Sequence, residues 1–193
     1  MKNIMQCTSC KTGQLKQSKL DNTLACRTCD NCGGHWIKLD DYMEWHKTQD
    51  PLQAVVEEIG VEVDTLESTQ ALLCPETGAI MTKFRITSDT DHKIDWCNKS
   101  AAIWLDKGEW ELLKEKGVAD KLNQIFSKQW QEQIITETSR NTREAFLANK
   151  LGEENYSRLK LVRTWFHEQS DEDKALMVSF LVSKDPFSPK SKS

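Results

Sequence analysis

The chain has 193 residues, of which 38% are hydrophobic and 29% charged, and its formal net charge is -4. This length accommodates one ordinary domain or two small ones, and the composition predicts a folded chain. The acidic balance excludes a protein that coats nucleic acid through bulk positive charge. No apolar run approaches the roughly 20 residues that cross a bilayer, and the N-terminus lacks the apolar stretch of a signal peptide. We therefore expect a soluble cytoplasmic protein in a reducing compartment, where paired cysteines indicate metal more often than disulfides.

Two short cysteine pairs dominate the first unit, residues 1–46. Cys7 and Cys10 form one C-x-x-C pair and, after residues 11–28, Cys29 and Cys32 form another. Each pair, in a tight turn, directs two sulfurs toward one point, and a hairpin that joins the pairs completes the tetrahedral shell that zinc prefers. We therefore assign these four cysteines as ligands of one Zn²⁺ per chain.

The residues between the pairs are predicted to form a β-hairpin. Gln14–Leu20 and Thr23–Cys29 are strand-like, and Asp21-Asn22 is a favourable reversal. Asp40 is then placed to cap a short helix that runs through Trp45.

Other uses of these cysteines stay open. Four ordinary buried cysteines or a redox C-x-x-C pair are alternatives, although neither pair has the βαβ context of a redox motif. Four thiolates also hold iron, as in a rubredoxin-like electron-transfer site. Cys26 is a fifth nearby cysteine, which we interpret as a small buried side chain. His35 follows the second pair, and we do not assign it as a ligand because four cysteines already fill the shell.

An acidic connector follows at residues 47–73. It carries six acids and no base after Lys47, which accounts for the negative balance of the chain. Part of it, around residues 52–59, has the spacing of an amphipathic helix, and a solvated linker fits the same residues equally well.

Residues 74–117 repeat the first unit in altered form. An internal repeat of this kind predicts two copies of one structural unit. A shift of 67 or 68 positions aligns the two stretches and places Cys7 on Cys74, Cys10 on Thr77, Cys29 on Cys97, Cys32 on Ser100 and Trp36 on Trp104.

The second copy is predicted to be a degenerate site. Cys74 and Cys97 remain, but Thr77 and Ser100 replace the other two ligands, and neutral hydroxyls are poor substitutes for thiolates at zinc. We expect no metal there, and we expect Cys74 and Cys97 to be thiols that lie close enough for a disulfide on oxidation. Apolar packing is predicted to take the place of the metal, through Ile80, Phe84, Ile86, Ile94, Trp96, Ile103 and Trp104.

Residues 118–185 are predicted to be helical, and residues 186–193 to be a disordered tail. Asp106 with Glu109 resembles a helix-start box before this region, and Gly117 is the predicted helix stop. Ser170 with Asp173 is predicted to cap the last helix. Apolar residues recur every four positions from Leu122 through Phe126 and Trp130 to Ile134. We interpret Trp110, Trp130 and Trp165 as core residues.

The two cysteine-containing stretches resemble the transcription factor IIB-type zinc ribbon family. The second copy is similar to the tail of the family pattern at Ile94–Cys97 and Ile103–Glu109. The first copy keeps the four cysteines and Gly34–Ile37, and departs from the pattern at Lys38–Asp41. The resemblance covers residues 5–46 and 73–113 and implies a zinc-ribbon fold. It does not settle the function, because zinc ribbons serve several roles.

Together these patterns predict an α+β chain, with tandem small zinc-ribbon-like β-hairpin units followed by an all-helical C-terminal region. We expect a non-enzymatic interaction module whose partner is another protein, with a link to transcription and no membrane or small-molecule substrate. Nucleic-acid binding is the main alternative, since a small basic group lies in or beside the first hairpin. Its members are Lys11, Lys16, Lys19 and Arg27.

Overall fold

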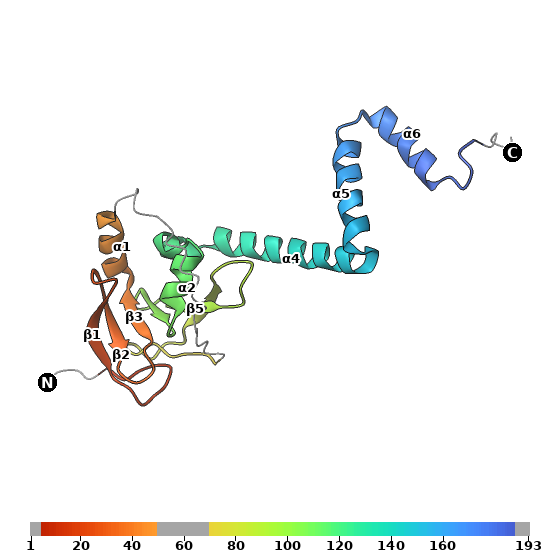
Figure 1. The fold of residues 1–193 in the computed structure, drawn as a ribbon. Helices are drawn as coiled ribbons and strands as arrows, with labels where there is room; N and C mark the ends of the chain where they lie inside the picture. The colour runs from red at the N-terminus through yellow and green to blue at the C-terminus, as the bar shows by residue number, and fades with distance from the viewer. Residues whose placement is uncertain (1–4, 50–69, 188–193) are drawn as a thin grey trace. The chain divides into compact units, whose positions relative to one another are not determined.

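The computed structural model describes residues 5–49 and 70–187, and Figure 1 shows the arrangement of their helices and strands. The contacts divide the chain into two units, Met1–Thr138 and Ser139–Ser193. The possible helix around residues 52–59 and most of the predicted tail lie outside the described residues.

The first unit is built on one six-stranded antiparallel sheet. Its strand order is β1-β2-β3-β6-β5-β4, so the two hairpins occupy the outer positions and β3 and β6 meet at the centre. The strands are β1 Leu15–Leu20, β2 Leu24–Cys29, β3 His35–Lys38, β4 Thr82–Arg85, β5 Lys93–Cys97 and β6 Ala102–Leu105.

The predicted first hairpin is confirmed. β1 and β2 pair from Leu15↔Cys29 to Leu20↔Leu24, and a three-residue loop joins them. Asp21 and Asn22 in this loop have φ values of 45° and 62°. Aspartate and asparagine tolerate this left-handed region better than most residues, which explains why the chain reverses here.

The two ribbon-like stretches, treated above as separate units, share this sheet. β3 pairs with β6, and Trp36 lies opposite Trp104 in the centre of the pairing. The strand–strand–strand–helix order therefore occurs twice, with the two third strands side by side. The β3–β6 pairing provides hydrogen-bond partners for backbone N–H and C=O groups that would otherwise lie unpaired on two exposed sheet edges.

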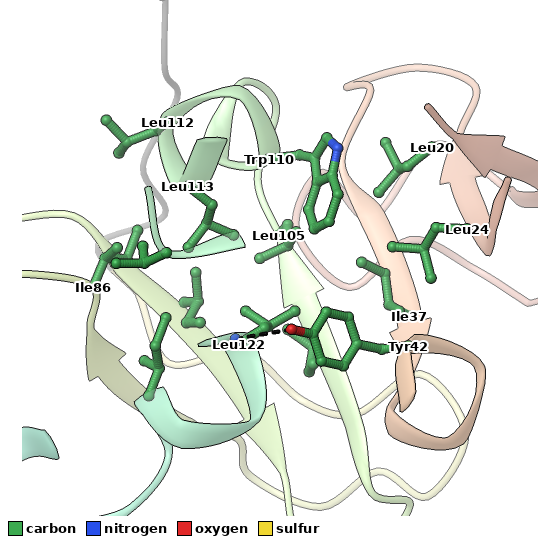
Figure 2. Close-up of a cluster of buried hydrophobic side chains, with 14 of the residues drawn as sticks. Leu20, Leu24, Ile37, Tyr42, Ile86, Leu105, Trp110, Leu112, Leu113 and Leu122 are labelled. Atoms are coloured by element: carbon green, nitrogen blue, oxygen red, sulfur yellow. Dashed lines mark hydrogen bonds between the residues drawn. The ribbon is translucent and has the colours of Figure 1, made fainter. Parts of the chain in front are cut away.

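Helices cover one face of the sheet. They are α1 Leu39–Thr48, α2 Glu109–Glu115, the 3-10 turn η1 Ala119–Lys121, α3 Leu122–Ile125 and the start of α4 Lys128–Leu151. Figure 2 shows the apolar cluster on this face, which we call the helix-side core. Its buried members are Leu20, Leu24, Cys26, Ile37, Tyr42, Ile86, Ile94, Ile103, Leu105, Trp110, Leu112, Leu113, Val118, Leu122 and Ile125.

The hydroxyl group of Tyr42 links α1 to η1 and α3 within this core. The Tyr42 hydroxyl donates to the Ala119 carbonyl at 2.9 Å and accepts from the Leu122 N–H at 3.1 Å, the dashed bond in Figure 2. Trp110 is also fully buried, and its indole N–H donates to Asp21 at 2.8 Å in the β1–β2 loop. This hydrogen bond fixes α2, in the second stretch, to the β1–β2 hairpin of the first.

The predicted cap at Asp40 is wrong. α1 begins at Leu39, with Lys38 at the cap position and no side-chain capping bond. Asp40 and Asp41 instead occupy the first turn, where their negative charge faces the positive end of the helix dipole.

Only one of the two hydrogen bonds expected of the predicted helix-start box is present at the start of α2. Glu109 accepts a hydrogen bond from the Asp106 N–H at 2.7 Å, but the Asp106 carboxylate accepts from the Trp104 indole at 2.7 Å and does not cap the helix. The predicted stop is confirmed: Gly117 has a φ of 63°, and the Val118 N–H donates to the Leu113 carbonyl at 2.9 Å. This is the usual closing pattern of a helix with a left-handed glycine.

The helical region is interrupted at a point that the four-residue spacing of its apolar residues does not predict. α3 ends at Ile125 and α4 begins at Lys128, yet Leu122 and Ile134 are buried and Phe126 and Trp130 pack against the helix-side core. The first unit therefore extends past residue 117, where the sequence placed its boundary. A four-residue apolar spacing survives the break because α3 and the start of α4 both pack against the helix-side core.

The second unit consists of the end of α4, α5 Glu153–His167 and α6 Asp171–Val182. The predicted cap is confirmed, because the Ser170 hydroxyl accepts from the Asp173 N–H at 3.1 Å. The assignment of Trp165 to a core is wrong: its exposed fraction is 52%, and neither α5 nor α6 contains a buried residue. None of the described helices is long and apolar enough to cross a membrane.

Replacing Gly34 by Ala tests the central pairing. A Cβ at Gly34 would overlap the Trp104 ring, lying 2.8 Å from its Cη2 atom and 3.1 Å from the Leu105 carbonyl oxygen. We expect Gly34→Ala to lower the free energy of unfolding by about 1–3 kcal/mol, the usual cost of overpacking, in urea titrations followed by circular dichroism.

Trp104→Phe supplies the control, because phenylalanine lacks the ring atoms that would be overlapped. The cost of Gly34→Ala should be smaller in the Trp104→Phe background than in the natural chain. An equal cost in both backgrounds would contradict the proposed contact.

Candidate metal centre

The four predicted ligands lie together at one end of the first hairpin. All four sulfurs are within 4.8 Å of one another. The Cys7 and Cys32 sulfurs are 3.6 Å apart, and those of Cys10 and Cys29 are 3.7 Å apart. A tetrahedron with zinc–sulfur bonds of about 2.3 Å has edges of roughly 3.8 Å, so the sulfurs already have the spacing of a zinc tetrathiolate.

Backbone hydrogen bonds shape the turns that present these sulfurs. The Cys7 N–H donates to the Gly13 carbonyl at 2.8 Å, and the Cys29 N–H donates to the Gly34 carbonyl at 2.8 Å. The Gly33 N–H closes the second turn on the Cys29 carbonyl at 3.1 Å. Gly33 has a φ of 75°, a conformation that other residues resist.

Several N–H groups point at the sulfurs themselves. The Gly13 N–H lies 3.3 Å from the Cys10 sulfur, and the Asn31 and Cys32 N–H groups lie 3.4 and 3.5 Å from the Cys29 sulfur. Donors of this kind partly neutralise thiolates and orient them toward a bound metal.

The four thiols do not ionise equally well without a cation. Burial raises the pKa of Cys7 far above its ordinary value and that of Cys32 to about 11. At Cys10, burial is the largest single influence and raises the pKa, but the hydrogen bonds from Asn31, Thr12 and Gly13 together outweigh it and lower the pKa to about 5. A divalent cation at the centre supplies the positive charge that lets all four become thiolates. The donor set and its spacing therefore fit one Zn²⁺ ion.

Cys26 and His35 lie outside this group. The Cys26 sulfur is buried in the helix-side core and contacts the Ser18 hydroxyl at 3.0 Å, so the interpretation as a buried side chain is confirmed. His35 shares a 2.9 Å hydrogen bond with the Thr28 hydroxyl, and burial lowers its pKa. Neither belongs to the cluster of four ligands.

The residues of the predicted degenerate site also come together. The Cys74 sulfur lies 3.3 Å from the Ser100 hydroxyl, and the Thr77 hydroxyl lies 3.8 Å from the Cys97 sulfur. These are the same two pairings as in the first group, with a hydroxyl in place of one sulfur in each. The first group is the only cluster of three or more metal-binding side chains that the described residues contain.

Both groups border one apolar cluster on the face of the sheet opposite the helices. We call it the knuckle-side core. Trp36 and Trp104 lie at its centre, and the Thr8 hydroxyl donates to the Leu73 carbonyl beside it. Its buried members are Cys7, Leu15, Cys29, Trp36, Leu72, Cys74, Met81, Cys97, Ala102 and Trp104.

Apolar packing in the second stretch is extensive but differs in detail from the prediction. Ile86, Ile94, Ile103 and Trp104 are fully buried, whereas Ile80 is exposed and contributes no core contact. Ile80 precedes β4 and forms only an isolated bridge with Leu73, so the alternation read from the sequence starts too early.

The comparison with protein families agrees with this geometry. Residues 6–48 match the profile of the transcription factor zinc-finger family. The match contains all four cysteines, the first hairpin, β3 and α1. No curated protein and no solved structure in the comparisons matches the chain.

Metal analysis of the purified, reduced chain tests the site. We expect one zinc ion per chain and no colour, because an oxidised iron tetrathiolate would be red. Cys29→Ser should lose most of the zinc, since three thiolates and a hydroxyl make a poor shell. Cys26→Ser is the matched control and should keep one zinc. Two zinc ions per chain, or full zinc retention in Cys29→Ser, would contradict the assignment.

Gly13→Ala tests the packing behind the ligands. A Cβ at Gly13 would overlap the Cys29 sulfur and lie 2.8 Å from the Asn31 Cβ. We expect about a 10- to 100-fold loss of zinc affinity, the usual effect of disturbing the shell around metal ligands, in competition with a coloured chelator.

Gly78→Ala serves as the control, because a Cβ there meets nothing within 4 Å. It lies in the corresponding turn of the second stretch and should leave zinc affinity unchanged. Equal effects of the two substitutions would show that the loss has another cause.

Proposed function

We propose that this chain is a non-enzymatic, cytoplasmic zinc-ribbon adaptor that binds another protein through its C-terminal helices. The observation that carries the proposal is the exposure of α6. Its large apolar side chains, with exposed fractions from 48% to 77%, are Leu176, Val178, Phe180, Leu181 and Val182.

The composition of α6 points to a covered position in a complex. From Ala175 to Val182 the helix is apolar around its whole circumference, apart from Ser179. A helix of this kind is normally buried, and large exposed apolar patches mark interaction sites. α5 adds further exposed apolar residues, among them Leu161 and Trp165.

We also propose that residues 74–117 are a second, metal-free copy of the ribbon. Three features support this: the same order of strands and helix, the pairing of Trp36 with Trp104, and the matching contacts of Cys74 and Cys97 with hydroxyls. The second copy completes the sheet and buries the edge of the metal-binding copy. Its role in the adaptor is that of a rigid support.

A link to transcription is part of the proposal and is supported by the family match at residues 6–48. Direct nucleic-acid binding has weaker support. Lys16, one of the four basic residues at the first hairpin, is paired with Asp30 at 2.8 Å. The chain also has a negative net charge of -4. Both features reduce the attraction of phosphate groups to this surface.

Affinity capture from native lysate with the full chain tests the proposal. Leu181→Asp places a charge in the exposed apolar helix, and we expect at least a tenfold loss of captured partner protein, because the charge must be desolvated on binding. Ser179→Asp is the matched control: it adds the same charge to the same helix without removing an apolar contact.

Two results would contradict the adaptor proposal. Leu181→Asp could capture the same proteins as the natural chain, which would exclude α6 as the binding element. Alternatively, nuclease treatment of a parallel sample could remove all bound material, which would favour the nucleic-acid alternative. Salt-dependent binding of purified nucleic acid would support that second outcome.

A further inference from the structure

The second group of ligand-like residues has a chemistry of its own. Two thiols and two hydroxyls occupy the positions that four thiols occupy in the metal centre. Hydroxyls are poor zinc ligands, so no divalent ion stabilises the sulfurs of Cys74 and Cys97 as it does those of the first group. The fold brings the two thiols into the same buried cluster.

We propose that Cys74 and Cys97 are an oxidisable thiol pair that forms a disulfide with a hydroperoxide as oxidant. This modification site is independent of the adaptor proposal, because it lies in the first unit and not in α6. The geometry places both thiols in one small group. The Cys74 sulfur lies 3.3 Å from the Ser100 hydroxyl, the Cys97 sulfur lies 3.8 Å from the Thr77 hydroxyl, and both thiols are buried members of the knuckle-side core.

Hydrogen bonds prepare Cys97 as the attacking thiolate. Burial disfavours its charged form, but hydrogen bonds from Ser100, Cys74 and Thr77 outweigh burial and lower the pKa of Cys97 to about 7. A substantial fraction is therefore thiolate at neutral pH, and thiolates are the reactive form of cysteine. Cys74 belongs to the same buried cluster, so it is the thiol that can complete the reaction.

The two hydroxyl side chains of the group are more exposed than its two thiols. Cys74 and Cys97 are buried, whereas Thr77 is exposed and Ser100 is half-buried. Hydrogen peroxide is small enough to suit such a site, while a bulky disulfide oxidant is not.

The reaction balances in two steps. The Cys97 thiolate attacks one oxygen of hydrogen peroxide, the O–O bond breaks, and Cys97 sulfenic acid and hydroxide form. The Cys74 thiol then attacks the Cys97 sulfur, the S–O bond breaks, and water leaves as the S–S bond forms. Together the two sulfurs lose two electrons, which reduce the peroxide. The product joins the two turns covalently, as zinc joins the corresponding turns of the first copy.

Oxidation of the full-length, zinc-loaded chain with hydrogen peroxide tests this inference. We expect peptide mass mapping, after blocking of free thiols, to show a Cys74–Cys97 cross-link with retention of one zinc ion. A thiol reductant should reverse it. Cys74→Ser and Cys97→Ser should each abolish the cross-link. Each substitution replaces a thiol by a hydroxyl in a group that already contains two hydroxyls.

Cys26→Ser is the control, because it removes a buried thiol outside the pair and should leave the cross-link unchanged. Ser100→Ala removes the hydroxyl that contacts the Cys74 sulfur at 3.3 Å and that also helps to lower the pKa of Cys97, so it should slow formation of the cross-link several-fold at neutral pH. The inference is overturned if Cys74 and Cys97 remain free while Cys26 is oxidised. It is also overturned if they cross-link only to the first four cysteines after zinc release. The mapping of the natural chain decides between these results even if a variant does not fold.

Discussion

The pairing of β3 with β6 is the interaction on which the rest of the first unit depends. It joins two three-stranded halves, β1–β3 and β4–β6, into one sheet and places Trp36 opposite Trp104. Each indole N–H finds a carboxylate, Glu76 at 3.2 Å for Trp36 and Asp106 at 2.7 Å for Trp104. Without this pairing, each stretch would have an exposed strand edge and too little surface for a core of its own.

The central strands also separate the two apolar cores, which lie on opposite faces of the sheet. Successive side chains of a strand point to opposite faces, so Ile37 and Ile103 enter the helix-side core while Trp36 and Trp104 enter the knuckle-side core. Helices cover the first face, and the turns that carry the cysteines lie against the second. The metal centre is therefore supported by packing that extends into the second stretch.

The two cysteine groups have the same pairings but different side chains. The metal centre has four sulfurs at 3.6–3.7 Å in its close pairs, and the second group keeps the same pairings with two hydroxyls. Four thiolates need a cation to coexist, whereas two thiols flanked by hydroxyl donors do not. Apolar side chains such as Ile94 and Trp104 are fully buried in the second stretch and stabilise it.

The sequence by itself determined the local features. Cysteine spacing identified the four ligands, the Asp21-Asn22 reversal identified the first hairpin, and Gly117 and Ser170 marked helix ends, because each depends on residues close in the chain. Only the tertiary structure decided the rest. The β3–β6 pairing, the break before α4, the use of Asp106 by Trp104 and the exposure of Trp165 all depend on contacts between distant residues. An apolar spacing shows which side chains share a helix face, but it does not show whether another part of the chain covers that face.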